Sequence, residues 1–106
     1  MITDAPVRRH AELKMSFRET FTIESLAAGY AKSIRPPAVE GMPEELAKLL
    51  LAAYEEHKSE LYVVTSYGVP IAWGCVRCQR DDGLTVPSHT YPHQITRRHQ
   101  AIARRA

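Results

Sequence analysis

Apolar side chains recur with a helical period over residues 43–58, and this is the clearest pattern in the chain. They stand three and four positions apart, so a helix would carry them on one face. Pro43 suits the first helical position, where its missing N–H costs nothing, and Glu44 and Glu45 favour the positive end of the helix dipole. The pattern predicts one amphipathic helix with an apolar stripe of Leu46, Leu49, Leu50, Ala53 and Tyr54 that ends in a partly buried His57.

Two runs that follow this helix are typical of β-strands. Residues 61–67 and 71–76 are rich in β-branched and aromatic side chains, and Gly68 with Pro70 favours a turn between them. Asp82-Gly83 is a strong two-residue hairpin signal, and residues 84–86 would form the return strand. These runs predict a three-stranded β-meander.

The N-terminal part of the chain has weaker patterns. Residues 1–14 are polar and mixed, which indicates a flexible N-terminal arm before a single domain of residues 15–106. Apolar and polar positions alternate over residues 15–23, and this alternation predicts a fourth strand. An alternative interpretation places a helix over residues 23–34 with Thr22 as its N-cap.

The C-terminal segment is expected to be a short basic helix. Tyr91-Pro92 interrupts the strand pattern, and Thr96 can cap a helix over residues 97–106. The predicted fold is therefore α+β: a small antiparallel β-meander of three to four strands, packed by one amphipathic helix and followed by the basic helix.

Composition limits the kind of protein but does not identify it. The chain has 106 residues, 44% hydrophobic and 25% charged, which is the balance of one ordinary globular domain. A domain of this size has little room for a deep active-site cavity as well as a core. No apolar run approaches the ~18 residues of a membrane span, and the first residues lack the apolar segment of a secretory signal. We expect a cytoplasmic protein without a membrane partner.

Positive charge is concentrated at the C-terminal end. The net charge is only +2, but Asp82 is the last acid, and four arginines follow it. Basic residues on one helix can neutralise backbone phosphates, and a tyrosine nearby can stack on a base. The candidate residues for binding nucleic acid or a protein partner are Arg97, Arg98, His99, Arg104, Arg105 and Tyr91. The alternative is that the arginines form a solvated face and complement the helix dipole.

Four residues near the C-terminus have the ligand types of a zinc site. Cys75 and Cys78 are followed by His89 and His93. The intervening residues read as a hairpin and a strand, and Pro92 opposes the helix that a zinc finger would need there. A zinc knuckle is the alternative to a plain hairpin, and it requires a bend because positions i and i+3 on a flat strand face opposite ways. No other cofactor is expected.

Signals for catalysis are weak. The sequence has no glycine-rich phosphate loop and no Gly-x-Ser-x-Gly nucleophile elbow. A thiol–imidazole pair between one of the cysteines and a histidine is an option with no supporting spacing. We therefore expect a protein that is not an enzyme.

Two stretches resemble known sequences. Residues 66–73 read SYGVPIAW and residues 95–100 read ITRRHQ. They are similar to the SYxTPIAW-like core and TTSRHQ-like tail of short uncharacterised proteins from actinobacterial phages and prophages, over about residues 61–106. The match departs at Val69 and across residues 92–95. The resemblance implies a hairpin-plus-helix module in a small phage-type accessory protein.

Together these features predict a function based on binding. The expected partner is a host or phage protein in the host cytoplasm. Nucleic-acid binding through the basic C-terminal helix is the first alternative, and a small zinc-knuckle protein is the second.

Overall fold

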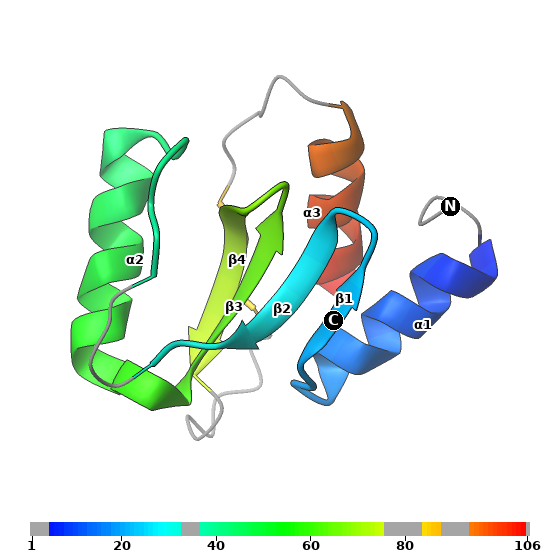
Figure 1. The fold of residues 1–106 in the computed structure, drawn as a ribbon, viewed down its shortest axis with the longest axis horizontal. Helices are drawn as coiled ribbons and strands as arrows, with labels where there is room; N and C mark the ends of the chain where they lie inside the picture. Colours follow the sequence, from blue (N-terminus) through cyan, green and yellow to red (C-terminus); the bar gives the residue numbers. More distant parts are fainter. Residues whose placement is uncertain (1–4, 33–36, 76–83, 88–93, 106) are drawn as a thin grey trace.

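The computed structural model describes residues 5–32, 37–75, 84–87 and 94–105 (Figure 1). Four strands form one antiparallel sheet in the order β1-β2-β3-β4. In chain order the elements are α1 (Ala5–Ser16), β1 (Phe21–Ile23), β2 (Leu26–Tyr30), α2 (Glu44–His57), the short 3-10 helix η1 (Lys58–Glu60), β3 (Leu61–Ser66), β4 (Val69–Cys75) and α3 (Gln94–Arg105). The predicted α+β class, with a small antiparallel sheet, is confirmed.

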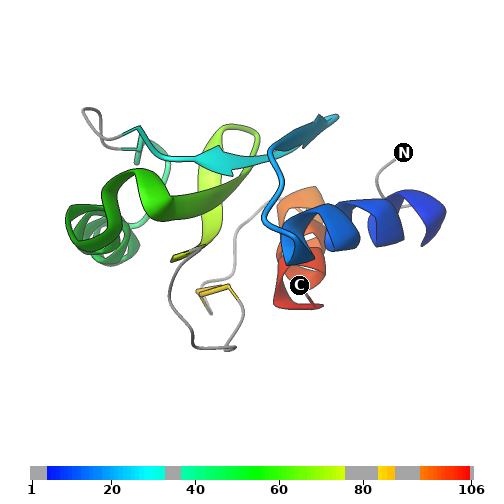
Figure 2. The ribbon, with the colours of Figure 1, turned by 90° about the horizontal axis from the view of Figure 1, so that it is seen from below.

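Helices pack on both faces of the sheet. Figures 1 and 2 show α2 on one side of the strands and α1 with α3 on the other. Side chains on β3 alternate accordingly, because successive residues of a strand point to opposite faces. One core cluster joins α2 to the sheet through Leu50, Tyr54, Leu61, Val63 and Trp73. The other joins α1 and α3 to the sheet and includes Ala11, Met15, Tyr62, Val64, Ala72, Ile102 and Ala103.

The predicted hairpin of residues 61–76 is confirmed as β3 and β4. Tyr67 and Gly68 connect β3 to β4 with positive φ angles of 54° and 78°. Two residues with this conformation form the kind of turn that matches the twist of antiparallel strands. On the edge of β4 that faces away from β3, Trp73 exchanges two backbone hydrogen bonds with Thr85, at 3.1 and 2.7 Å. Among the described residues, the predicted return strand over residues 84–86 is present only as this single bridge. The predicted Asp82-Gly83 turn lies outside the described residues.

The predicted N-terminal arm is wrong from Ala5 onward. Residues Ala5–Ser16 form α1, and Ala11 and Met15 are fully buried. Met15 therefore belongs to a helix, and Phe17 lies beyond the helix end with 74% of its surface exposed. The predicted fourth strand exists only as β1, because Met15 and Ser16 are the last residues of α1 and residues 17–20 connect that helix to the strand.

The alternative helix over residues 23–34 is also wrong. Residues 21–30 form the β1–β2 hairpin, with Glu24 at a positive φ of 54° in its turn. β2 pairs with β3 from Leu26 opposite Ser66 to Tyr30 opposite Tyr62. This pairing outweighs the local helical pattern, because a helix would satisfy its own backbone groups but would leave the facing backbone groups of buried β3 without partners.

The helix predicted for residues 43–58 is confirmed as α2, with Pro43 in the capping position one residue before it. Leu50 and Tyr54 are buried, whereas Leu49 is 58% exposed. The buried stripe is therefore narrower than the predicted one. Thr96 is not a cap either, since α3 already begins at Gln94.

Candidate functional site

Two helices that are far apart in the sequence meet on one face of the sheet. α1 packs against α3, and both contribute to the same core, Ala11 and Met15 from one and Ile102 and Ala103 from the other. Their outward sides carry one acid, Glu12, and seven basic residues: Arg8, Arg9, Lys14, Arg97, Arg98, Arg104 and Arg105. We call these two helices with their side chains the basic layer. All six of its arginines are exposed.

The opposite side of the sheet has the reverse charge. α2 and η1 carry five acids and two lysines: Glu44, Glu45, Glu55, Glu56, Glu60, Lys48 and Lys58. Lys48 pairs with Glu44 at 3.6 Å and Lys58 with Glu55 at 2.9 Å. The small net charge of the chain therefore conceals a molecule that is positive on one face and negative on the other. Such a separation orients a protein in the field of a charged partner.

A hollow of about 380 Å³ lies within the basic layer. Arg8 lines it from α1, and Arg98, Ala101, Ile102 and Arg105 line it from α3. The α3 residues are spaced i, i+3, i+4 and i+7, which places them on one stripe of the helix. Buried Ile102 is the apolar part of this stripe, and an arginine stands at each end.

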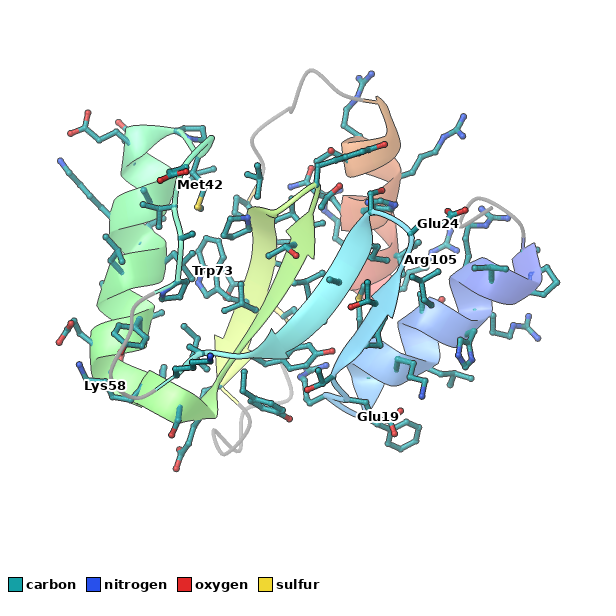
Figure 3. The ribbon with its side chains drawn as sticks, viewed as in Figure 1. Glu19, Glu24, Met42, Lys58, Trp73 and Arg105 are labelled. Atoms are coloured by element: carbon teal, nitrogen blue, oxygen red, sulfur yellow. The ribbon has the colours of Figure 1, made fainter. Side chains whose placement is uncertain are left out.

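No acid lines the hollow within the part of the chain that the structure describes, and no ion pair joins its arginines to another described residue. Figure 3 shows Glu24, in the β1–β2 turn, on the same side of the molecule as Arg105. Glu24 therefore borders the basic layer without lining the hollow, and Glu19 borders it at the end of α1, where it pairs with Lys14 at 3.7 Å. Three guanidinium groups around one concave site favour an anionic ligand.

Buried polar contacts hold α3 on the sheet. The Ser66 hydroxyl on β3 lies 2.7 Å from His99 Nδ1 and 3.1 Å from Thr96 Oγ1. Gln100, next to His99 on α3, donates from Nε2 to the carbonyl of Pro87 at 3.3 Å. These contacts set the rotation of α3 about its axis, so that its arginines face outward.

His99 differs from the prediction that it contacts a partner. It is fully buried, and Ser66 is 1% exposed. A serine hydroxyl beside an imidazole nitrogen is also the arrangement of a nucleophile and its base. Because both groups are buried, a substrate cannot reach this hydroxyl in the folded chain. The pair is a structural contact between β3 and α3.

The aromatic residues divide between core and surface. Trp73 is buried against α2, as expected, and Tyr62 is buried on the opposite face, whereas Tyr67 is 52% exposed. The Tyr62 hydroxyl donates to the Glu19 carbonyl at 2.7 Å. Burial raises the pKa of the Tyr62 hydroxyl well above its usual value, neighbouring Tyr30 raises it further, and Arg18 lowers it in part.

The proposed zinc ligands fall mostly outside the described residues. Cys75 is half-buried at the end of β4, opposite Leu61. Cys78, His89 and His93 are not described, and neither is Tyr91. Among the residues that are described, no group of three or more His, Cys, Asp or Glu side chains is placed to hold a metal ion. The zinc knuckle stays a prediction.

The α1 half of the basic layer was missed in the sequence. Arg8, Arg9 and Lys14 fall in the segment expected to be an arm. Val7, Ala11 and Met15 are spaced i, i+4 and i+8, and this helical spacing was the available signal.

Comparisons with models of known protein families, with curated proteins and with solved structures found no match to this chain. Within the described ranges, no helix has the length and apolar character needed to cross a membrane.

Proposed function

We propose that the protein binds nucleic acid through the basic layer. The observation that supports this proposal is the packing of α1 on α3, which gathers six exposed arginines and Lys14 on two helices whose described residues include one acid, Glu12. Glu19 pairs with Lys14 at 3.7 Å, and the arginines stay in excess over the acids around them. A surface of this charge attracts the phosphate backbone and releases counterions from it. The acidic α2 side would be repelled by the same backbone, so the molecule would approach with α1 and α3 first.

Salt dependence tests this proposal directly. The affinity for a fluorescently labelled duplex and for a single strand is measured by anisotropy at several KCl concentrations. Contact with four or five phosphates predicts a slope of about −4 in a plot of log affinity against log salt for the duplex. Replacing Arg97 and Arg98 by Ala should make the slope less negative by about 2, because each loses one phosphate contact.

Lys48→Ala is the matched control. It removes one positive charge from the acidic side, where the Lys48 side chain is 73% exposed. The slope should not change if the basic layer makes the contacts. Binding that is absent or insensitive to salt contradicts the proposal. A slope change of about 1 with Lys48→Ala, half that of the double variant, would mean that only net charge matters.

A protein partner is the second candidate, and a separate surface favours it. Leu13 on α1 and Phe17 just beyond its end are four positions apart and are 52% and 74% exposed. Apolar side chains with this exposure, bordered by basic residues, suit an apolar partner surface with acidic edges. The phage-type accessory role, with a host or phage protein as target, belongs to this candidate.

Variants separate the two candidates. A tagged copy is used to recover partners from nuclease-treated extract. A protein partner held by this surface should be retained by Arg98→Ala and lost by Phe17→Ser. The reverse pattern, with loss on Arg98→Ala only, would contradict the apolar contact. Both candidates are binding functions and require no catalytic residue.

A further inference from the structure

The hollow between α1 and α3 combines charge from two helices at one point. Arg98 and Arg105 are seven residues apart on α3, which corresponds to about 10.5 Å along the helix axis. Arg8 lines the same hollow from the neighbouring helix. Figure 3 shows Arg105 on the side of α3 that lies toward α1. A ligand in the hollow would therefore be reached by guanidinium groups from both ends and from the side.

The number of arginines distinguishes between kinds of phosphate. A phosphodiester in a nucleic-acid backbone carries one negative charge, which leaves most of the charge of the three lining arginines uncompensated. A phosphomonoester carries about −1.5 to −2 at neutral pH and offers three strong acceptor oxygens. Each guanidinium can donate two parallel hydrogen bonds to such a group. The charge and the donor geometry of the hollow therefore suit a monoester better than a diester.

The remaining lining suits the part of the ligand that follows the phosphate. Ala101 and Ile102 form an apolar patch between the two α3 arginines. The volume of about 380 Å³ lies within the range of small-molecule sites, and it is large enough for more than a phosphate alone.

We propose that the hollow lined by Arg8, Arg98 and Arg105 binds a phosphomonoester, the terminal phosphate of a nucleic-acid strand. This inference rests on the proposed nucleic-acid binding and adds a preference for strand ends. With such a site, the protein binds a 5′-phosphorylated strand more tightly than the same strand with a 5′-hydroxyl end. The basic layer outside the hollow contacts the adjoining backbone in both cases.

The test compares two short single-stranded DNA oligonucleotides of the same sequence, labelled at the 3′ end. One carries a 5′-phosphate and the other a 5′-hydroxyl. The wild-type protein should bind the phosphorylated strand about tenfold more tightly, because charge-assisted hydrogen bonds to the extra charge are gained only there. Arg98→Ala with Arg105→Ala should reduce this ratio to about one.

Arg97→Ala with Arg104→Ala is the matched control. It removes the same charge from the same helix, but neither residue lines the hollow. Both strands should bind more weakly while the ratio stays near ten. Arg98→Lys with Arg105→Lys keeps the charge and removes the planar fork, so it should reduce the ratio even if the alanine variant does not fold. Competition by thymidine 5′-monophosphate against thymidine repeats the comparison on the wild-type protein.

The outcomes separate this inference from the proposed function. Equal binding of both strands with a normal salt slope overturns the phosphomonoester site and leaves nucleic-acid binding in place. No binding of either strand overturns both. A phosphoserine peptide that competes as well as the mononucleotide would overturn the assignment to strand ends and indicate a phosphorylated protein. Loss of the ratio in the Arg97 and Arg104 control would place the site outside the hollow.

Discussion

The contact between Ser66 and α3 allows a quantitative test of how the basic layer is positioned. The Ser66 hydroxyl is shared by His99 Nδ1 at 2.7 Å and Thr96 Oγ1 at 3.1 Å. All three residues are at most 5% exposed. Ser66→Ala removes the hydroxyl with little change in shape, so its effect is mainly the loss of these two polar contacts.

The expected loss of stability is about 2 kcal/mol. Leaving a buried polar group without a former partner costs about 1–3 kcal/mol. The Thr96 contact is the longer of the two, so it carries the smaller share of the cost. His99 Nδ1 makes the shorter contact, at 2.7 Å, so most of the expected loss comes from it. For a domain of this size, about 2 kcal/mol corresponds to a melting temperature lower by about 8–10 °C.

Urea unfolding is the assay. Trp73 is the single tryptophan of the chain and lies in the core cluster on the other face of the sheet, so its fluorescence reports global unfolding. Ser16→Ala is the control, because Ser16 Oγ donates to the Glu12 carbonyl at 2.9 Å in an exposed position. It should change stability by less than about 0.5 kcal/mol. If Ser66→Ala also lowers the free energy of unfolding by less than about 0.5 kcal/mol, the reasoning is refuted, because the buried contacts then contribute almost nothing to stability.

Three further predictions concern the sheet and its two faces. Leu50→Ala should destabilise the fold by about 3 kcal/mol, since Leu50 is fully buried, whereas Leu49→Ala, at a site 58% exposed, should cost less than about 0.5 kcal/mol in the same urea assay. Gly68→Ala should cost about 1 kcal/mol by thermal unfolding, because φ is +78° there and no steric contact adds to the strain. Burial raises the pKa of the Tyr62 hydroxyl above its usual value of 10.0, so the folded state favours the neutral form and loses stability as pH rises above about 10. Tyr62→Phe should lessen that loss, and a stability curve between pH 9 and 12 as steep as that of the wild type would contradict it.

The elements that could be predicted from the sequence are those whose signals are local. α2 has a helical stripe, a proline before its first turn and acids in that turn, and each of these favours the same helix. The β3–β4 hairpin has a glycine at a position that needs a positive φ, between runs of strand-forming residues. In both cases the local preference and the tertiary packing agree, so the pattern was sufficient.

The N-terminal third could not be predicted because its local preference is weak and its partners are distant. α1 has arginines and a glutamate near its few small apolar positions, and only the contact of Ala11 and Met15 with the sheet layer makes it a stable helix. Leu26, Ala27 and Tyr30 fit a helical face equally well. They form a strand because β3, more than thirty residues later, supplies the hydrogen bonds.

The same reasoning explains why only half of the candidate site was visible in the sequence. The absence of acids after Asp82 identified the α3 arginines, but a basic helix alone is as consistent with a solvated face as with a site. What distinguishes the two is whether charge converges from a second element. The burial of His99 and Gln100 turns Arg98 and Arg105 toward α1, where Arg8 lines the same hollow. The uncharged residues that attach α3 to the sheet therefore determine which arginines can act together. The spacing of the arginines in the sequence does not determine this on its own.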